Sequence, residues 1–143
     1  MINALIIGCG RIFSKHYNSL KKIGENKIKI VGVCDLKDKK KNEINKKYGL
    51  KFFFNYKKAI LKTNPDVAII LTPSGLHAEH ISFCLKKNCH VIVEKPMCLK
   101  EADGKNILRL SKKVKKRVFV VMQNKFNIPI IKLRRDIQDK KFG

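Results

Sequence analysis

Short apolar runs alternate with longer amphipathic stretches along the whole chain, and this alternation limits the possible folds more than any other feature. The apolar runs predict strands at residues 3–7, 28–34, 51–54, 67–71, 90–93 and 117–121. The stretches between them predict helices at residues 11–23, 38–48, 56–63, 77–87, 100–115 and 129–140. Strands and helices that alternate through short connections are typical of a doubly wound parallel sheet. We therefore expect an α/β fold with six parallel strands and flanking helices.

A glycine-rich turn follows the first expected strand. Residues 8–13 read GCGRIF, which is G-x-G-x-x-G with Phe13 in the third glycine position. Gly8 allows a tight turn, Gly10 lets the backbone approach a pyrophosphate, and the helix that follows offers free N–H groups to phosphates. A strand, this turn and a helix in that order predict a Rossmann-type dinucleotide site. Phe13 implies a changed helix position with the phosphate site kept, and a glycine turn without a ligand is the alternative.

The second expected strand ends at Asp35. A carboxylate at this place accepts hydrogen bonds from the adenosine ribose and would repel the extra phosphate of NADP. The sequence therefore favours NAD over NADP as the cofactor. Lys37 and the lysines at 39–41 lie close enough to offset part of that repulsion, so NADP remains the alternative. Asp35 could also serve only as a helix or turn cap.

Two further polar motifs follow later strands. Residues 72–77 read TPSGLH after the fourth expected strand, and residues 94–96 read EKP after the fifth. In an open parallel sheet, ligands bind at the carboxyl ends of the strands. We therefore expect both motifs to lie near the glycine turn. The other histidines, His16, His80 and His90, are expected to be structural or surface residues.

The glycine turn and these two motifs together resemble the Gfo/Idh/MocA family of dinucleotide-dependent sugar oxidoreductases. That family carries a G-x-G turn, a T-P-x-x-x-H loop and an E-K-P motif in this order and spacing, and the resemblance covers essentially the whole chain. Within the family, residues 72–77, 93–97 and 121–124 are most similar to bacterial UDP-N-acetylglucosaminuronate 3-dehydrogenases. Those enzymes oxidise C3 of a UDP-linked sugar acid on the way to surface polysaccharides.

The resemblance implies a role for each matching residue in the cofactor site. The pyrophosphate would be lined by Gly8, Gly10, Arg11 and Ile12, and the adenosine ribose would be held by Asp35. The middle of the cofactor would lie along Thr72, Ser74 and His77. Packing or capping of the helix that follows is the alternative role for His77.

The resemblance also implies roles at the nicotinamide end. Glu94 would face the nicotinamide ribose, and Gln123 would close over the nicotinamide. Lys95 would be the catalytic residue beside the nicotinamide and the reacting carbinol, and the Lys95–Pro96 bond is often cis in the family. Hydride transfer from a carbinol carbon requires the hydroxyl proton to leave, and a lysine at this place can accept it. A surface lysine in a turn is the alternative reading of Lys95.

The formal net charge of +22 suggests a nucleic-acid-binding domain at first sight. Of the 33 basic residues, however, 28 are Lys and only 5 are Arg. Ile, Lys and Asn share A/T-rich codons and make up 57 of 143 residues, so the excess of lysine follows a genomic bias. Arginine, which direct base readout favours, is scarce. We therefore keep a basic nucleic-acid-binding domain only as an alternative and expect no specific nucleic-acid partner.

The five cysteines, at positions 9, 34, 84, 89 and 98, contain no C-x-x-C pair. We expect buried, reduced thiols in a cytoplasmic protein and no metal site. No apolar run approaches the roughly 18–20 residues of a membrane span, and the first residues lack the basic region of a signal peptide. We therefore expect no membrane association.

Members of the family carry a second α/β domain that supplies most of the substrate pocket and the sheet through which they form oligomers. We expect residues 1–124 to form the NAD(P)-binding domain and residues 125–143 to begin, as a helix, the connection to a C-terminal substrate domain that is absent. The chain is then the cofactor domain of an NAD(P)-dependent oxidoreductase acting on a CH–OH group, truncated or split and inactive alone. Homo-oligomers are expected only with the second domain. A non-catalytic dinucleotide-binding module or a gene remnant is the alternative.

Overall fold

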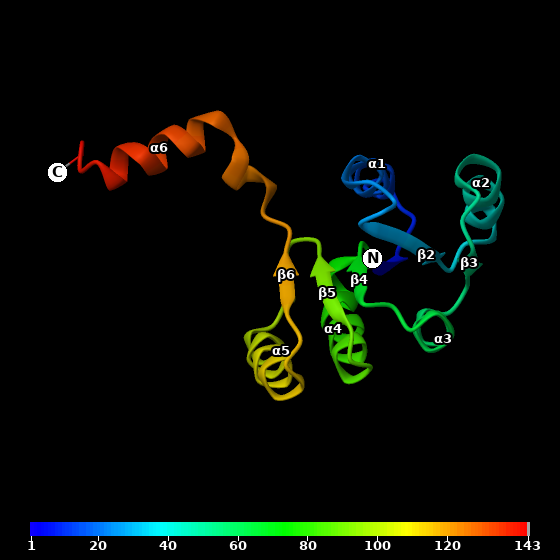
Figure 1. The fold of residues 1–143 in the computed structure, drawn as a ribbon. Coiled ribbons are helices and arrows are strands. Elements are labelled where there is room, and N and C mark those ends of the chain that lie inside the picture. The colour runs from blue at the N-terminus through cyan, green and yellow to red at the C-terminus, as the bar shows by residue number, and fades with distance from the viewer. Residues whose placement is uncertain (143) are drawn as a thin grey trace.

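The apolar runs of the sequence form one six-stranded sheet (Figure 1). The computed structural model describes residues 1–142, and its strands are β1 (Ile2–Ile7), β2 (Ile28–Cys34), β3 (Phe52–Phe53), β4 (Val67–Ile70), β5 (His90–Val93) and β6 (Val118–Val120). All neighbouring strands are parallel, in the order β3-β2-β1-β4-β5-β6. The predicted doubly wound parallel sheet is confirmed. Its order reverses between β1 and β4, which is the place where such sheets bind ligands.

Helices cover both faces of the sheet (Figure 1). One face is covered by α1 (Phe13–Ile23) and α2 (Asp38–Tyr48), and the other by α3 (Tyr56–Thr63), α4 (His77–Lys86) and α5 (Glu101–Val114). The predicted start of the first helix at residue 11 is two residues too early, because residues 8–12 form the glycine turn. The sequence also did not predict two short 3-10 helices, η1 (Ser74–Leu76) and η2 (Gln123–Phe126).

Alternating side chains of the central strands pack into two separate cores. On β1, Ala4 and Ile6 pack toward α1 and α2, whereas Leu5 and Ile7 pack toward α3 and α4. All four side chains are buried. Strands that are apolar on both faces are expected in a parallel sheet that helices cover on both sides. The two cores fix the carboxyl ends of β1 and β4 side by side.

Apolar side chains remain exposed beyond β6. Helix α6 (Ile128–Gln138) projects away from the sheet and has no buried residue (Figure 1). The exposed apolar residues are Phe119 on β6 itself and, after it, Met122, Phe126, Ile128, Ile130, Ile131, Leu133, Ile137 and Phe142. Exposed apolar side chains gathered in this way are typical of an interaction surface. Among residues 1–142, no helix has the length and apolar character that a membrane crossing requires.

The two-sided packing can be tested with a matched pair of leucines. The side chain of Leu85 on α4 is 0% exposed, whereas that of Leu108 on α5 is 57% exposed. We expect Leu85→Ala to lower the free energy of unfolding by about 2–5 kcal/mol, because it leaves a cavity in the core. We expect Leu108→Ala to change it by no more than about 0.5 kcal/mol. Urea unfolding followed by circular dichroism measures both, and equal effects would contradict the described packing of α4.

Candidate functional site

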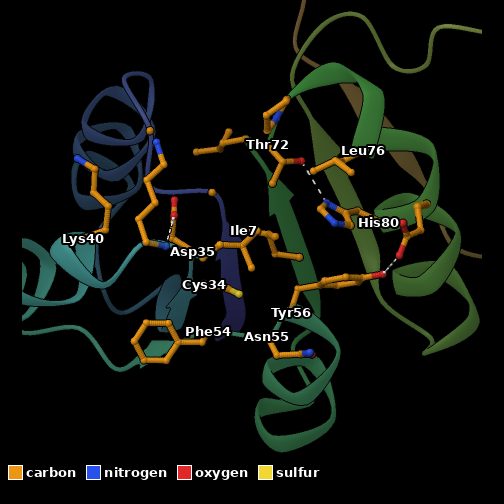
Figure 2. Close-up of a pocket in the computed structure, with 17 residues that line it drawn as sticks. Ile7, Cys34, Asp35, Lys40, Phe54, Asn55, Tyr56, Thr72, Leu76 and His80 are labelled. Carbon is orange, nitrogen blue, oxygen red and sulfur yellow. Dashed lines mark hydrogen bonds between the residues drawn. The ribbon is translucent and has the colours of Figure 1, made fainter.

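A cavity of about 530 Å³ opens at the carboxyl ends of β1, β2 and β4. It lies where the strand order reverses, so three loops contribute to its walls. Asp35 and Lys40 lie on one side of the cavity, and Thr72, Leu76 and His80 lie on the other (Figure 2). The motifs that the sequence singled out after β1, β2 and β4 therefore meet at one place.

The glycine turn forms the inner wall of this cavity through two glycines with different roles. Gly8 has a φ of 103°, and a Cβ atom there would lie 2.7 Å from the carbonyl carbon of Leu71. The Gly8 N–H also donates to the Cys34 carbonyl at 2.7 Å, so the turn contacts both neighbouring strands. A Cβ atom at Gly10, by contrast, would meet nothing within 4 Å. Gly8 is therefore required by the fold, and Gly10 keeps space open toward the cavity.

The N-terminus of α1 lies directly after this turn. Within residues 1–142, the backbone N–H groups of Gly10, Arg11 and Ile12 have no hydrogen-bond partner, and no side chain caps the helix. Free N–H groups and the helix dipole together favour an anion such as a phosphate at this place. Phe13, in the third glycine position, is buried and packs edge-on against the ring of Tyr48 on α2. The side chain that replaces glycine thus lies between the two helices and leaves the turn open.

Asp35 connects the end of β2 to the glycine turn. Its Oδ2 accepts a hydrogen bond from the Cys9 N–H at 2.8 Å, and its Oδ1 accepts one from the Lys37 N–H at 3.1 Å. Each carboxylate oxygen can accept a second hydrogen bond, so the group remains able to bind a hydroxyl in the cavity. Asp35 therefore caps a turn, which was the alternative role that the sequence left open. Its predicted role at the adenosine ribose stays a prediction.

Lys40 lines the cavity on the same side as Asp35. Its Nζ donates to Glu43 Oε2 at 2.6 Å, and this hydrogen bond raises the pKa of Lys40. The lysine positive charge near Asp35 is thus partly neutralised by a carboxylate on its own helix.

The opposite wall contains Thr72, which the sequence indicated, and further polar groups that it did not. Thr72 Oγ1 lies 3.1 Å from His80 Nδ1, and the Tyr56 hydroxyl donates to Glu79 Oε1 at 2.6 Å (Figure 2). The rings of Tyr56 and His80 lie with their centroids 4.2 Å apart. Burial lowers the pKa of His80 and raises that of Tyr56, so both rings are held in their neutral forms. This wall is therefore uncharged apart from Glu79 and suits a flat, uncharged group.

His80 was expected to be a structural or surface residue, and Tyr56 had no predicted role. A histidine within a helix carries no local signal for its long-range contacts. His80 comes three residues after His77 and so lies on the same helix face. This spacing is the only signal in the sequence that could have indicated a role for His80 near the site.

The loop after β5 lies beside α1. Glu94 Oε1 is 2.8 Å from His16 Nε2, and both side chains are largely buried. Lys95 is exposed, and its peptide bond to Pro96 is cis. His16, expected to be structural, thus holds a residue with a predicted role at the nicotinamide ribose.

His77 lies between the loops that follow β4 and β5. Its side chain is 1% exposed, with Nδ1 2.7 Å from the Pro96 carbonyl oxygen and Nε2 2.7 Å from the Thr72 carbonyl oxygen. The ring thus has backbone partners on both sides and does not line the cavity. Its predicted contact with the middle of a cofactor stays a prediction.

Four of the predicted site residues line the cavity: Gly8, Gly10, Asp35 and Thr72. The others, which lie outside its walls, are Arg11, Ile12, Ser74, His77, Glu94, Lys95 and Gln123. Ser74 begins η1, and Gln123 begins η2 with its side chain exposed. The roles of these residues toward a cofactor stay predictions.

The cysteines near the cavity are buried thiols, as their apolar sequence context predicted. Burial is the main cause that raises the pKa of Cys9 and that of Cys34 to about 12. Neither thiol is therefore a nucleophile near neutral pH. Residues 1–142 contain no group of three side chains able to hold a metal ion.

Comparison with known proteins gives a family match over most of the chain. The model described as "Oxidoreductase family, NAD-binding Rossmann fold" matches residues 2–122. D-glucoside 3-dehydrogenase of Escherichia coli K12 is 25% identical over 99% of this chain and 40% of its own length. Myo-inositol 2-dehydrogenase of Thermotoga maritima is 26% identical over 96% of this chain and 41% of its own length.

Two solved structures are similar over nearly the whole chain. The WlbA dehydrogenase of Chromobacterium violaceum, in complex with NADH and UDP-GlcNAcA, has a TM-score of 0.93 and 32% identity over 99% of this chain and 41% of its own. The WlbA dehydrogenase of Bordetella pertussis, with the same two ligands, has a TM-score of 0.94 and 28% identity. The match covers 99% of this chain and 43% of the other chain. The chain thus spans about 40% of the length of the relatives it matches.

The different roles of the two glycines can be tested by stability. We expect Gly8→Ala to lower the free energy of unfolding by about 1–3 kcal/mol, because of its positive φ and its contact with Leu71. Gly10→Ala serves as the matched control, and we expect a change of no more than about 0.5 kcal/mol. Urea unfolding measures both values. A Gly10→Ala variant as unstable as Gly8→Ala would contradict the open space at Gly10.

The neutral state of His80 predicts how stability depends on pH. Because burial lowers the folded-state pKa of His80 from the ordinary 6.5, the unfolded chain binds more protons than the folded chain from somewhat above pH 6.5 down through the lowered pKa. Stability should therefore fall as the pH decreases from about 7.5 through about 6.5. His80→Asn should make the melting temperature less dependent on pH in this window. Thermal unfolding at several pH values measures the effect, and an unchanged slope would show that another group causes it.

Proposed function

We propose that this chain, which belongs to the Gfo/Idh/MocA oxidoreductase family and forms its NAD-binding domain, binds NAD in the cavity beside the glycine turn. The enzyme that it serves would be a dehydrogenase that acts on a sugar or nucleotide sugar. The observation that carries the proposal is the arrangement of that turn. Gly10, with open space around it, and the Asp35 carboxylate line one cavity, and the other free N–H groups at the start of α1 follow Gly10 directly.

The residues present fit a dinucleotide. The N–H groups of Gly10, Arg11 and Ile12 would hold the phosphates, and a Cβ at Gly10 would fill the space they need. Asp35 would accept hydrogen bonds from the adenosine ribose. Apolar side chains of the cavity, Leu36 and Leu76 among them, suit an adenine ring.

The charges around Asp35 favour NAD over NADP. A 2′-phosphate would lie beside the Asp35 carboxylate and be repelled by it. Lys40 could offset that repulsion, but it is already hydrogen-bonded to Glu43. Lys37, which also lines the cavity, could offset part of the repulsion, so the preference for NAD rests on the Asp35 carboxylate itself.

Lys95 is the candidate proton acceptor. When bound, the nicotinamide would take a hydride from the carbinol carbon of the substrate. The hydroxyl proton would then pass to Nζ of Lys95, and the carbinol would become a carbonyl. Glu94, on the same loop, would bind the nicotinamide ribose and is held in place by His16. Gln123 would close over the nicotinamide end.

The substrate that we propose is a UDP-linked N-acetylglucosaminuronate, oxidised at C3. The similarity to two WlbA dehydrogenases that bind NADH and UDP-GlcNAcA supports this choice. Other relatives are named for other substrates, a D-glucoside and myo-inositol. Because the chain spans about 40% of these relatives, we propose that turnover and any oligomer require a second domain and that this chain alone binds only the cofactor.

A titration with NADH tests the proposal. The fluorescence of NADH should rise to saturation when it is titrated with the purified chain at physiological salt. NADPH, titrated in parallel, should bind more weakly. Asp35→Asn should weaken NADH binding by about tenfold, as the loss of a charged hydrogen-bond acceptor predicts. It should also narrow the difference between NADH and NADPH, because the repulsion of the 2′-phosphate is lost.

Asp38→Asn is the matched control, because it makes the same change of charge at an exposed residue outside the cavity. It should leave both affinities within about twofold of the original, since exposed charges are screened at this salt. A folded chain that does not bind NADH would contradict the proposal. Binding of NADH and NADPH that disappears at physiological salt would instead indicate adhesion of polyanions to a basic surface.

A further inference from the structure

We propose that His77 is a positioning residue that links the loop after β4 to the loop after β5 and thereby fixes Lys95 at the nicotinamide end of the site. This inference rests on the proposed function. It adds a role to a residue that contacts neither the cavity nor the exposed lysine, and it concerns only the nicotinamide half of the bound cofactor.

The evidence for the link begins with the burial and the two partners of the ring. His77 is the first residue of α4 and is 1% exposed. Nε2 lies 2.7 Å from the carbonyl oxygen of Thr72, and Nδ1 lies 2.7 Å from the carbonyl oxygen of Pro96. The ring therefore spans from one loop to the other inside the protein, where water does not compete for its hydrogen bonds.

Both partners of the ring are carbonyl oxygens, which only accept hydrogen bonds. A ring nitrogen that carries a proton donates to the carbonyl it faces, and the tautomer decides which carbonyl that is. The geometry thus points to a ring that lies between the two loops and contacts both of them.

The loop that carries Lys95 is held on either side of that residue. Pro96 is held by His77, and Glu94 is held by His16 on α1, at 2.8 Å. The Glu94 N–H also donates to the Ile70 carbonyl at 3.1 Å, which continues the β4–β5 ladder. Lys95 lies between these two attachments, so its backbone is positioned while its side chain remains exposed. A catalytic group held this way loses less freedom when substrate binds.

The other end of the link reaches the wall of the cavity. Thr72 lines the cavity and offers two groups to α4: its carbonyl oxygen faces His77, and its hydroxyl faces His80. These two histidines lie one helical turn apart on the same face of α4. The first turn of α4 therefore joins the cavity wall, through Thr72, to the loop that carries Lys95, through Pro96.

Three substitutions separate the two ends of the link. His77→Phe keeps an aromatic ring and removes both ring nitrogens. The amide nitrogen of Asn reaches the place of Nδ1 and can keep the Pro96 bond, whereas that of Gln reaches the place of Nε2 and can keep only the Thr72 bond. Each variant is titrated with NADH and with ADP by calorimetry, because ADP lacks the nicotinamide and its ribose.

We expect His77→Phe and His77→Gln to weaken NADH binding by about tenfold and ADP binding by no more than about twofold. His77→Asn should restore most of the NADH affinity, because it keeps the Pro96 bond. His90→Phe is the control: His90 lies at the opposite end of β5, where its Nδ1 accepts from the Arg117 N–H at 3.2 Å. That variant should bind both ligands with unchanged affinity.

Equal losses for NADH and ADP in the His77 variants would overturn the inference, since they indicate a general loss of stability. An unchanged NADH affinity in His77→Phe would overturn it as well. A wild-type chain that binds neither ligand would instead refute the proposed function.

Discussion

The contact between Gly8 and the backbone of Leu71 is the constraint on which the rest of the structure depends. The strand order of the sheet reverses between β1 and β4, which are neighbours. These two strands can end side by side only if the turn after β1 carries no side chain at position 8. A Cβ atom there would overlap the Leu71 carbonyl group. The close approach brings the start of α1 next to the loop after β4, and the cavity forms between them.

The same few groups support the fold and form the candidate site. Asp35 holds the glycine turn through the Cys9 N–H while it faces the cavity. Thr72 faces the cavity while it contacts His77 and His80. A ligand at this place would meet groups whose positions are already fixed by hydrogen bonds. Its binding would therefore lose little free energy in ordering these side chains. This sharing explains why stability and ligand binding must be measured together in variants of the site.

Local patterns in the sequence were sufficient for the elements and for part of the site. Apolar periodicity predicted all six strands, and the glycine turn and Asp35 were found from their places after β1 and β2. Contacts between distant segments were beyond such reasoning. His16 and Glu94 are 78 positions apart, and nothing local to either residue indicates their contact. Tyr56 was missed for the same reason, because its role depends on how α3 packs beside α4.

The two ends of the candidate site differ in how completely this chain encloses them. The cavity, proposed as the adenine end, has walls from β1, β2, α2, α3, α4 and the loops between them, all within residues 1–142. Lys95, at the other end, is exposed to water, which would compete with a substrate hydroxyl for its hydrogen bonds. Excluding water from this end would require additional protein surface. The exposed apolar side chains that follow β6 begin beside this loop, since β6 pairs with β5, and they offer the kind of surface on which such a cover could pack.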